Sequence, residues 1–336
     1  MLFFGSKSQL GIDIGTSTIK VVELGKTKEN FELKTFGMVD VSSKIMEKMQ
    51  RDIIEDTADI IRELLAKSKV KTKRAVVSLP NNVVFVTVIE MPSMSDKELK
   101  SAIEWEARRY IPLPLEEVTL SWSALRGDEK DPRIKVLLTA VPTTVIDNYL
   151  RMFKLAGVQP IALEIEALAL IRSLAGARTD GFMIIDIGAK NSSLNIVDHG
   201  FLQIGRNMST GGDTITREIA QSLKISFSRA EQFKMEMGTN SDMQQISGVI
   251  QSTIEGLKNE AAQLIKLYES KGGQVSEIIF TGSGASLPGL STFFNDLGVK
   301  MSLGKPLQFI SYDQKFAGEI SKVALGLSVA VGLAMR

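Results

Sequence analysis

The sequence predicts an α/β protein with two related domains that face each other, because one strand-and-loop pattern occurs twice. The first copy is GIDIGTSTIK, from Gly11 to Lys20, and the second is IIDIGAKNSS, from Ile184 to Ser193. In each copy an apolar run indicates a buried strand, an aspartate ends it, and a glycine permits the tight turn that follows. A third glycine-bearing segment, IIFTGSGA from Ile278 to Ala285, follows another apolar run. Together the three segments predict one pocket between the two domains.

The first domain is expected to open with strands. Residues 9–40 have the pattern of a β-meander, with IDI, IKVVEL and FELKTFGMVD as its strands. Apolar residues then recur at helical spacing from Met46 to Leu65 with charges between them, which predicts a helix. AVVSL, starting at Ala75, indicates a buried strand.

Residues 80–160 predict an inserted α+β module. VVFVTVIE is expected to be a strand, and Ser95 followed by Glu98 has the spacing of a capping box that begins a helix. The sequences LSWSAL and IKVLLTAV predict two more strands, joined by the charged turn 127–132. A helix over about 144–156 is expected to close the module.

The second half repeats the theme of strand, Asp-Ile-Gly and strand. A final helix is expected in VALGLSVAVGLAMR, from Val323 to Arg336, which is short and glycine-broken and therefore predicts a buried helix rather than a membrane span. The other predicted elements are strands over 181–187, 194–198 and 201–205, and long helices over about 213–236 and 250–270.

The glycine loops indicate phosphate chemistry. Backbone N–H groups and hydroxyls in such turns can bind phosphates, and paired carboxylates suit a hydrated Mg²⁺ ion. Asp13 and Asp186 are therefore the predicted metal ligands, although each could be a strand-end carboxylate in an Asx-turn. Lys20 is spaced so that it could reach back toward a phosphate, and its alternative is a surface lysine on a strand.

Composition excludes several classes of site. With 40 basic and 39 acidic residues the 336-residue chain has a formal charge of +1, which offers no electrostatic footprint for nucleic acid. The absence of cysteine excludes disulfides and thiolate metal sites, and the single histidine, His199, argues against a histidine metal site or catalytic triad. The N-terminus lacks the pattern of a signal peptide, and Leu2, Phe3 and Phe4 are expected to dock on the domain or stay disordered.

The loop residues resemble those of the actin, Hsp70 and sugar-kinase superfamily. Asp13, Gly15 and Lys20 match its first phosphate loop, and Asp186 and Gly188 match its second. The segment with Gly282, Ser283 and Gly284 matches its adenosine segment. This resemblance implies an actin-like ATPase fold, with two related domains around a nucleotide cleft.

One branch of that superfamily, which contains the FtsA and PilM families, fits best. GGDTITREIA leads to AEQFKMEMG, in which Glu231 and Lys234 match residues that lie near the ribose and adenine in that branch. The module at 80–160 lies where the branch has its extra FtsA-type α+β subdomain. AVVSLP, EWEARRYIPLP and RMFKLAGVQP are similar to segments of the PilM family of type IV pilus assembly.

This resemblance implies an ATP-binding or ADP-binding cytoplasmic adaptor that needs Mg²⁺. Its implied partner is the cytoplasmic N-terminal tail of PilN, an inner-membrane protein of the pilus machine, so the chain would be peripheral to that membrane and could self-associate. The nucleotide-binding residues that follow are Asp13, Gly15, Thr16, Ser17, Thr18, Lys20, Asp186, Gly188, Lys190, Asn191, Gly212, Glu231, Lys234, Gly282, Ser283 and Gly284. The implied subdomains are 1–79 with 161–183 and 321–336, the insert 80–160, 184–210 with 275–320, and the helical part 211–274.

Two other functions stay open. An FtsA-like polymerising division protein is one, although the branch's basic amphipathic helix does not follow the final helix. An ATP-hydrolysing or phosphotransferring enzyme is the other, and Glu164 or Glu166 could position its water, or both could be ordinary helix-start residues. No catalytic residue is assigned, and hydrolysis is expected to be slow at most.

Three further signals have more than one explanation. Lys190 could offer a counter-charge to phosphate or point to solvent. Glu231 and Lys234, one helical turn apart, could be an ordinary surface ion pair. Trp105, with Arg108, Arg109 and Tyr110, could form a protein–protein hot spot, and the alternative is core packing of the tryptophan with exposed arginines.

Overall fold

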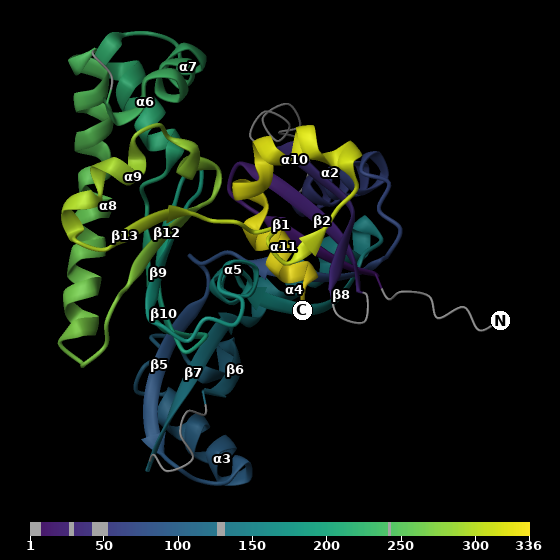
Figure 1. Ribbon diagram of the computed structural model, residues 1–336. Coiled ribbons are helices and arrows are strands. Elements are labelled where there is room, and N and C mark those ends of the chain that lie inside the picture. Colours follow the sequence, from purple (N-terminus) through teal and green to yellow (C-terminus); the bar gives the residue numbers. More distant parts are fainter. Residues whose placement is uncertain (1–7, 27–29, 42–52, 126–131, 241–242) are drawn as a thin grey trace.

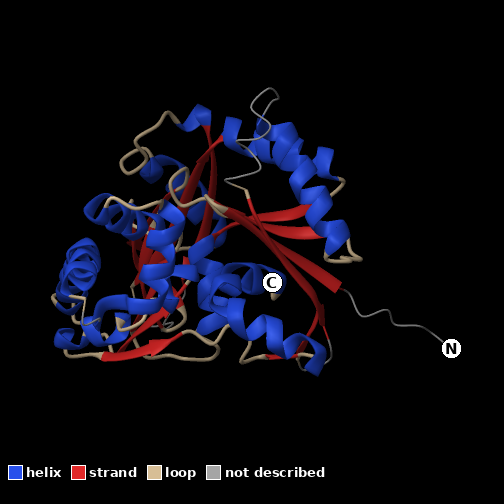
Figure 2. Ribbon diagram, turned by 90° about the horizontal axis from the view of Figure 1, so that it is seen from above, coloured by secondary structure: helices blue, strands red, loops and turns tan. Residues whose placement is uncertain are grey.

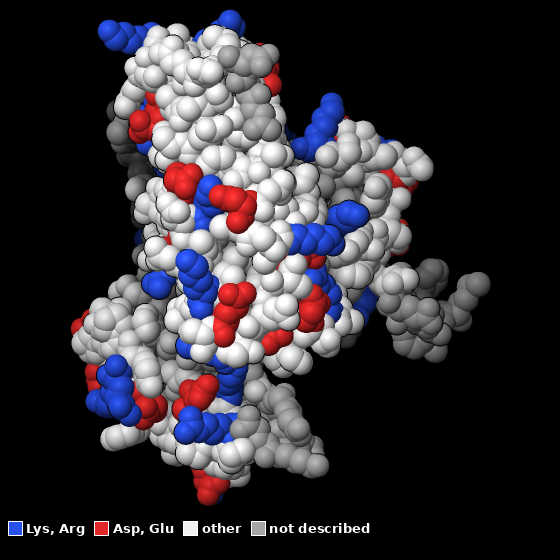
Figure 3. Space-filling model, turned by 60° about the vertical axis from the view of Figure 1, so that its left-hand side comes forward, with Lys and Arg blue, Asp and Glu red and all other residues white. Residues whose placement is uncertain are grey.

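A computed structural model of the chain describes residues 8–26, 30–41, 53–125, 132–240 and 243–336. Three sheets organise it, with six, five and three strands, and helices flank the two larger sheets (Figures 1 and 2). The expectations for Leu2 to Phe4, for the helix start near Met46 and for the turn 127–131 lie outside these described residues. On the face in Figure 3, basic and acidic side chains are interspersed, as the near-balanced composition predicts.

The six-stranded sheet confirms the predicted meander. Its first three strands are antiparallel neighbours; β4 then pairs with β1 in parallel, and β8 pairs with β4 in parallel. Buried residues such as Ile12 and Val77 on neighbouring strands form its core. The strand order is β14-β3-β2-β1-β4-β8, with β1 Ser8–Ile14, β2 Thr18–Lys26, β3 Phe31–Asp40, β4 Arg74–Leu79, β8 Gln159–Ile165 and β14 Ile310–Ser311.

Helix α4, Thr143–Ala156, does not close the inserted module as the sequence suggested. It packs beside α2, Ile53–Lys67, on the first sheet. The reason is the apolar stripe of Met152, Phe153 and Ala156, which is buried in the same cluster as the β1 core. The helix therefore belongs to the first sheet by packing, although it directly follows a strand of the insert.

The five-stranded sheet confirms the predicted strands of the second half. Its antiparallel strands are β9 Phe182–Ile187, β10 Ser192–Asp198 and β11 Phe201–Met208, followed in parallel by β12 Glu277–Thr281 and β13 Lys300–Leu303. The predicted helix over 213–236 is instead two helices, α6 Gly212–Leu223 and α7 Phe227–Met237. Lys224 breaks it with a left-handed φ of 55°, and Ser226 caps α7 by accepting the Arg229 amide at 3.3 Å. Helix α8, Gln244–Glu269, and the short α9, Leu290–Phe293, complete this part.

The insert is a three-stranded antiparallel sheet in the order β5-β7-β6, with one helix on it. Its elements are β5 Phe85–Pro92, α3 Asp96–Ala107, β6 Val118–Leu125 and β7 Arg133–Pro142. The predicted capping box is confirmed, because the Ser95 hydroxyl accepts the Glu98 amide and the Glu98 carboxylate accepts the Ser95 amide at 3.0 Å. Leu99 and Ile103 of α3 are fully buried against β7.

The insert also contacts the five-stranded sheet, because β5 lies against β11. Val84, Val86 and Val88 pack into one apolar cluster with residues of β9 and of helix α5, Glu166–Leu174. The Lys135 ammonium donates to the Gln203 amide oxygen at 2.9 Å across the same boundary. The insert, which is covalently continuous with the six-stranded sheet, therefore also packs against the five-stranded sheet.

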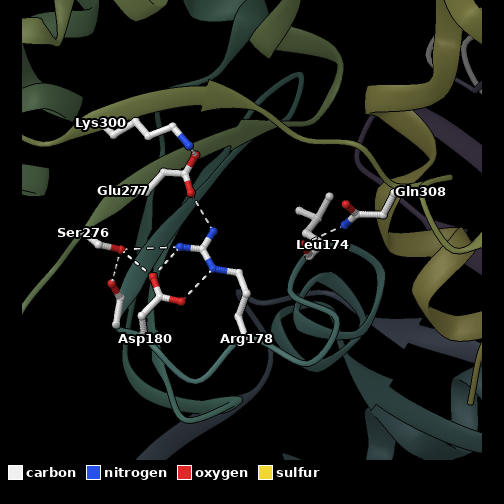
Figure 4. Close-up of polar contacts among 8 residues, drawn as sticks. Leu174, Arg178, Asp180, Ser276, Glu277, Lys300 and Gln308 are labelled. Atoms are coloured by element: carbon white, nitrogen blue, oxygen red, sulfur yellow. Dashed lines mark hydrogen bonds and ion pairs between the residues drawn. The ribbon is translucent and has the colours of Figure 1, made fainter.

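Two chain crossings connect the large sheets, and polar contacts hold both (Figure 4). At the exit of α5, Arg178 donates to Asp180 at 2.6 and 2.9 Å and to Glu277 of β12 at 2.6 Å. On the return crossing, the Gln308 amide donates to the Leu174 carbonyl at 3.0 Å. The returning chain forms α10, Ala317–Val323, and α11, Ser328–Ala334.

Helix α11 confirms the predicted buried helix near residue 330. Among the described helices, Gln314–Ala334 is the one stretch long and apolar enough to cross a membrane by composition. Its last seven residues, however, are all buried against β1, β4 and α5. Gly332 allows the contact with α5, since a Cβ there would lie 1.9 Å from the Ala169 carbonyl oxygen.

Candidate functional site

The two aspartate–glycine loops line one cavity of about 150 Å³ between the six-stranded and five-stranded sheets. The first loop follows β1, the second follows β9, and the third glycine segment follows β12. The strands thus deliver all three segments to the same place. The predicted residues in its lining are Asp13, Gly15, Thr16, Ser17, Thr18, Lys20, Asp186, Gly188, Asn191, Gly282 and Ser283.

A second cavity, of about 100 Å³, shares Gly188, Ala189 and Ser283 with the first. Helices α6 and α7 form part of its wall, and its lining includes the predicted Gly212, Glu231, Lys234 and Gly284. Lys190 is exposed and lines neither cavity. The structure therefore brings every predicted site residue to these two cavities except Lys190.

Asp13 is held at the first cavity by its neighbours in the sheet. It stands opposite Lys20 in the antiparallel register of β1 and β2, and the Lys20 ammonium lies 3.2 Å from its Oδ2. The Ser78 hydroxyl of β4 donates to its Oδ1 at 2.9 Å. Because Asp13 is only 3% exposed, these two donors fix the direction of its carboxylate.

Gly282 lets the third segment approach the second aspartate closely. Its φ is 85°, in the left-handed region that glycine tolerates, and a Cβ would lie 2.2 Å from Asp186 Oδ1. The glycine therefore places the backbone after β12 directly beside Asp186. A side chain at this position would displace that carboxylate.

The second loop and α6 are joined through the backbone. The Gly212 amide donates to the Gly188 carbonyl at 2.9 Å, and the Asp213 amide donates to the Ala189 carbonyl at 2.7 Å. From the other side of the first cavity, the Ser17 hydroxyl donates to Asp213 Oδ2 at 3.4 Å. Residues of the first loop, the second loop and α6 therefore meet at one point.

The two glutamates that the sequence could not separate have different positions. Glu164 accepts both ends of the Arg172 guanidinium, at 2.6 and 3.2 Å, and does not line either cavity. Glu166 lines the first cavity and accepts the Asn81 amide at 2.6 Å. Only Glu166 of this pair is placed to position a water in the cavity.

Three carboxylates share one lysine at the first cavity. Burial would lower the pKa of Lys20, but Asp13, Asp186 and Glu166 outweigh it and raise the pKa above its ordinary value. Burial raises the pKa of Asp186 to about 6, with Lys20 opposing and Asp13 adding to the shift. Burial, then Asp13 and Asp186, also raises the pKa of Glu166 well above its usual range. This surplus of negative charge favours a cation in the cavity.

Asp13 and Asp186 are suitable ligands for a Mg²⁺ ion whose remaining coordination positions would be filled by water and by a bound phosphate. Within the described ranges, no three His, Cys, Asp or Glu side chains are grouped so that they could hold a metal ion by themselves. Mg²⁺ is commonly bound through one or two carboxylates together with waters and phosphate oxygens. Two aspartates beside phosphate-type loops match that donor set, and the ion would offset the carboxylate charge.

The raised pKa of Asp186 predicts a pH-dependent loss of stability. Since the folded state keeps the proton from pH 3.8 up to about pH 6, it binds more protons than the unfolded state in that window. The free energy of unfolding contributed by this group therefore falls as pH rises through the window. Without nucleotide or metal, the gain in unfolding free energy from Asp186→Asn should be about 1–2 kcal/mol larger near pH 7.5 than near pH 5. Urea unfolding at both pH values measures it, and an equal difference at both would contradict the assignment.

The side chain of Lys234 is buried, unlike the lysine of an ordinary surface ion pair. Its side chain is 8% exposed, and its ammonium donates to Glu231 at 2.7 Å, to the Thr216 hydroxyl at 2.9 Å and to the Gly212 carbonyl at 3.1 Å. These bonds tie α7 to the first turn of α6. Lys234 thus forms a buried part of the second cavity wall, while the side chain of its partner Glu231 is 42% exposed.

The end of α3 presents an exposed aromatic surface on the insert. Trp105 is 69% exposed, so the expected core packing of this tryptophan is wrong. Tyr110 is 41% exposed, and the side chains of Arg108 and Arg109 are also exposed, with Arg109 donating to Glu106 at 2.9 Å. The helix buries Leu99 and Ile103 instead, which leaves Trp105 on the opposite side.

Comparisons with known proteins agree with this architecture. A family model described as type IV pilus assembly protein PilM matches residues 11–336. The solved structure of a PilM–PilN type IV pilus biogenesis complex superposes with a TM-score of 0.85 and 25% identity, covering 98% of each chain. Cell division protein FtsA of Streptococcus pneumoniae is 25% identical over 93% of this chain and 78% of its own length. MreB5 of Spiroplasma citri bound to ADP, at 12% identity and a TM-score of 0.54, shares the fold. The predicted actin-like ATPase fold is confirmed.

Proposed function

The chain belongs to the PilM family of type IV pilus assembly proteins, and from this membership we propose that it is an ATP-binding adaptor that captures the cytoplasmic tail of a PilN-type membrane protein. The observation that carries the nucleotide half is the meeting of three separate glycine segments at one cavity. The partner half is supported by the similarity to a solved PilM–PilN complex.

The first cavity offers the groups that a nucleotide's phosphates need. Backbone N–H groups of the two loops and the hydroxyls of Thr16, Ser17 and Thr18 supply donors, and Lys20 supplies a positive charge. Asp13 and Asp186 would hold Mg²⁺, whose charge neutralises phosphate oxygens. The adjoining second cavity, with Glu231 and Lys234, is then the place for ribose and base.

The partner peptide is proposed to add to an exposed strand edge near the insert. β8 pairs with β4 on one side, and its other side pairs with no described strand of the sheet. Ile161 of β8 is 42% exposed, and β6 forms the outer edge of the inserted sheet. An extended tail could bond to such an edge through its main chain and place apolar side chains beside it.

Titration of nucleotide tests the first half of the proposal. Isothermal calorimetry with Mg-ATP should show saturable binding to the wild type and a loss of about tenfold to 100-fold in affinity for Asp13→Asn and Asp186→Asn. Asp296→Asn is the matched control, because Asp296 is exposed, pairs with Lys258, and neither residue lines either cavity. Its affinity should equal that of the wild type.

A fluorescent peptide with the sequence of a PilN cytoplasmic tail tests the second half in the same samples. Saturable binding is the expected result. Nucleotide binding without peptide binding would reject the adaptor role and keep the ATP site. Equal nucleotide affinity in the wild type and in both aspartate variants would reject the proposed site.

A further inference from the structure

The turn that starts the insert also lines the first cavity. Residues Pro80, Asn81 and Asn82 connect β4 of the six-stranded sheet to β5 of the inserted sheet, and all three contribute to the cavity wall. The Val83 amide closes the turn by donating to the Pro80 carbonyl at 3.1 Å. A change in the cavity can therefore act directly on the first strand of the insert, with no intervening element.

Asn81 contacts three parts of the molecule at once. Its side-chain amide donates to Glu166 Oε2 at 2.6 Å, at the start of helix α5. Its backbone carbonyl accepts the Asn207 side-chain amide of β11 at 3.3 Å. The residue thus joins the entry to the insert with the first chain crossing and with the edge of the five-stranded sheet.

Glu166 connects this contact to the charge in the cavity. Its carboxylate lies among Asp13, Asp186 and Lys20, which are the charged groups expected to meet a Mg-nucleotide. A bound cation attracts this carboxylate, and bound phosphates repel it. Since Asn81 holds one of its oxygens, a shift of Glu166 changes the position or strength of the bond to Asn81.

On the insert side, β5 is positioned to pass such a change on. It pairs along its whole length with β7, from Phe85 opposite Ala140 to Pro92 opposite Arg133. Val86 and Val88 pack in the cluster that includes β9 residues, so β5 follows the second sheet as well as the turn. Movement at Asn81 would therefore reach the whole inserted sheet.

We propose that Asn81 is a relay that reports the occupancy of the nucleotide cavity to the inserted sheet. The relay rests on the proposed nucleotide site and adds to it a route of regulation for the partner-binding module. Asn81 acts through Glu166 and is a positioning residue. Coupling between two binding sites typically changes the affinity of one site by fivefold or more when the other is occupied.

Hydrogen–deuterium exchange of the full chain with and without Mg-ATP tests the relay. In the wild type, Mg-ATP should slow exchange in residues 11–20 and also in β5 and β7. In Asn81→Ala, Mg-ATP should still slow exchange in residues 11–20. Nucleotide affinity should stay within about tenfold of wild type, because the substitution removes the equivalent of one hydrogen bond. The slowing in β5 and β7 should be lost.

Asn295→Ala is the matched control. Asn295 is exposed, lines neither cavity, and its side chain forms no hydrogen bond within the described part of the chain. Its exchange response should equal that of the wild type. Retention of the β5 response in Asn81→Ala, or a wild-type response confined to 11–20, would overturn the relay and leave the nucleotide site standing. No slowing in any segment would overturn both.

Discussion

Replacing Lys20 with methionine is expected to destabilise the nucleotide-free protein by about 3–5 kcal/mol at neutral pH, the usual cost of leaving a buried charge without its partner. The described lining of the first cavity contains one cationic side chain, Lys20, beside Asp13, Asp186 and Glu166. Methionine keeps the length and the apolar stem of the side chain but removes the charge that offsets three carboxylates.

The destabilisation should shrink as pH falls, because protonated carboxylates no longer repel one another. Urea unfolding near pH 7.5 and near pH 5 measures the effect, and circular dichroism establishes whether the variant is folded at each pH. Lys67→Met is the control, since Lys67 forms an exposed helix pair with Glu63, and its loss should cost about 0.5 kcal/mol or less. An equal cost for both substitutions, or a Lys20→Met cost that does not depend on pH, would contradict the charge cluster.

Gly332→Ala is expected to lower the unfolding free energy by about 2–4 kcal/mol, because overpacking a tight contact displaces backbone. The added Cβ would lie 1.9 Å from the Ala169 carbonyl oxygen and 2.5 Å from its carbonyl carbon. Neither atom belongs to a flexible side chain, so α5 and α11 must separate. Helix α5 lies between β8 and β9 of the two large sheets, and α11 packs on β1, whose loop lines the first cavity, so the same substitution should also weaken nucleotide binding.

Gly256→Ala is the opposite case in the middle of α8. No atom lies within 4 Å of a Cβ added there, so the substitution only removes backbone freedom from the unfolded chain. It should stabilise the protein by about 0.5–1 kcal/mol. Thermal and urea unfolding of the two variants side by side test the contact, and a neutral Gly332→Ala would show that α5 and α11 are not tightly apposed.

The sequence predicted the loops of the candidate site because loop chemistry is local. An apolar strand, a terminal aspartate and a glycine turn identify themselves within ten residues, and the repeat at Asp186 indicated a second, facing copy. The spacing of Lys20 from Asp13 is also local, since a tight turn between antiparallel strands makes them opposite neighbours. The meander, the inserted sheet and the capping box at Ser95 depend on the same short-range rules.

What the sequence could not predict depends on directions set by packing. Glu164 and Glu166 have the same residue type and lie two positions apart, yet β8 ends between them and α5 begins at Glu166. Their side chains therefore leave toward different partners, Arg172 for one and the cavity for the other. Asn81 had no local pattern at all, and a sequence signal for it would have required knowledge that the insert begins at the cavity wall.

The predictions of where helices end and of what they pack against failed because both also depend on packing. Lys224 adopts a left-handed conformation at the end of α6. Glycine or asparagine at that position would have indicated a helix end, but lysine does not, so the sequence did not reveal the break between α6 and α7. The apolar stripe on α4 predicts a buried face but not which sheet covers it. The same holds for Trp105, whose residue type favours burial although the helix face that carries it points away from the insert's core.

The order of the strands along the chain has a consequence for biosynthesis. The five-stranded sheet and its helices come from one continuous stretch, from Phe182 to Leu303, which can assemble soon after it leaves the ribosome. The six-stranded sheet begins at Ser8 but receives β14 at Ile310 and its covering helix α11 only at Ser328. Since β1 and β2 are synthesised long before α11, the nascent chain exposes the apolar face that this helix covers until α11 has been made.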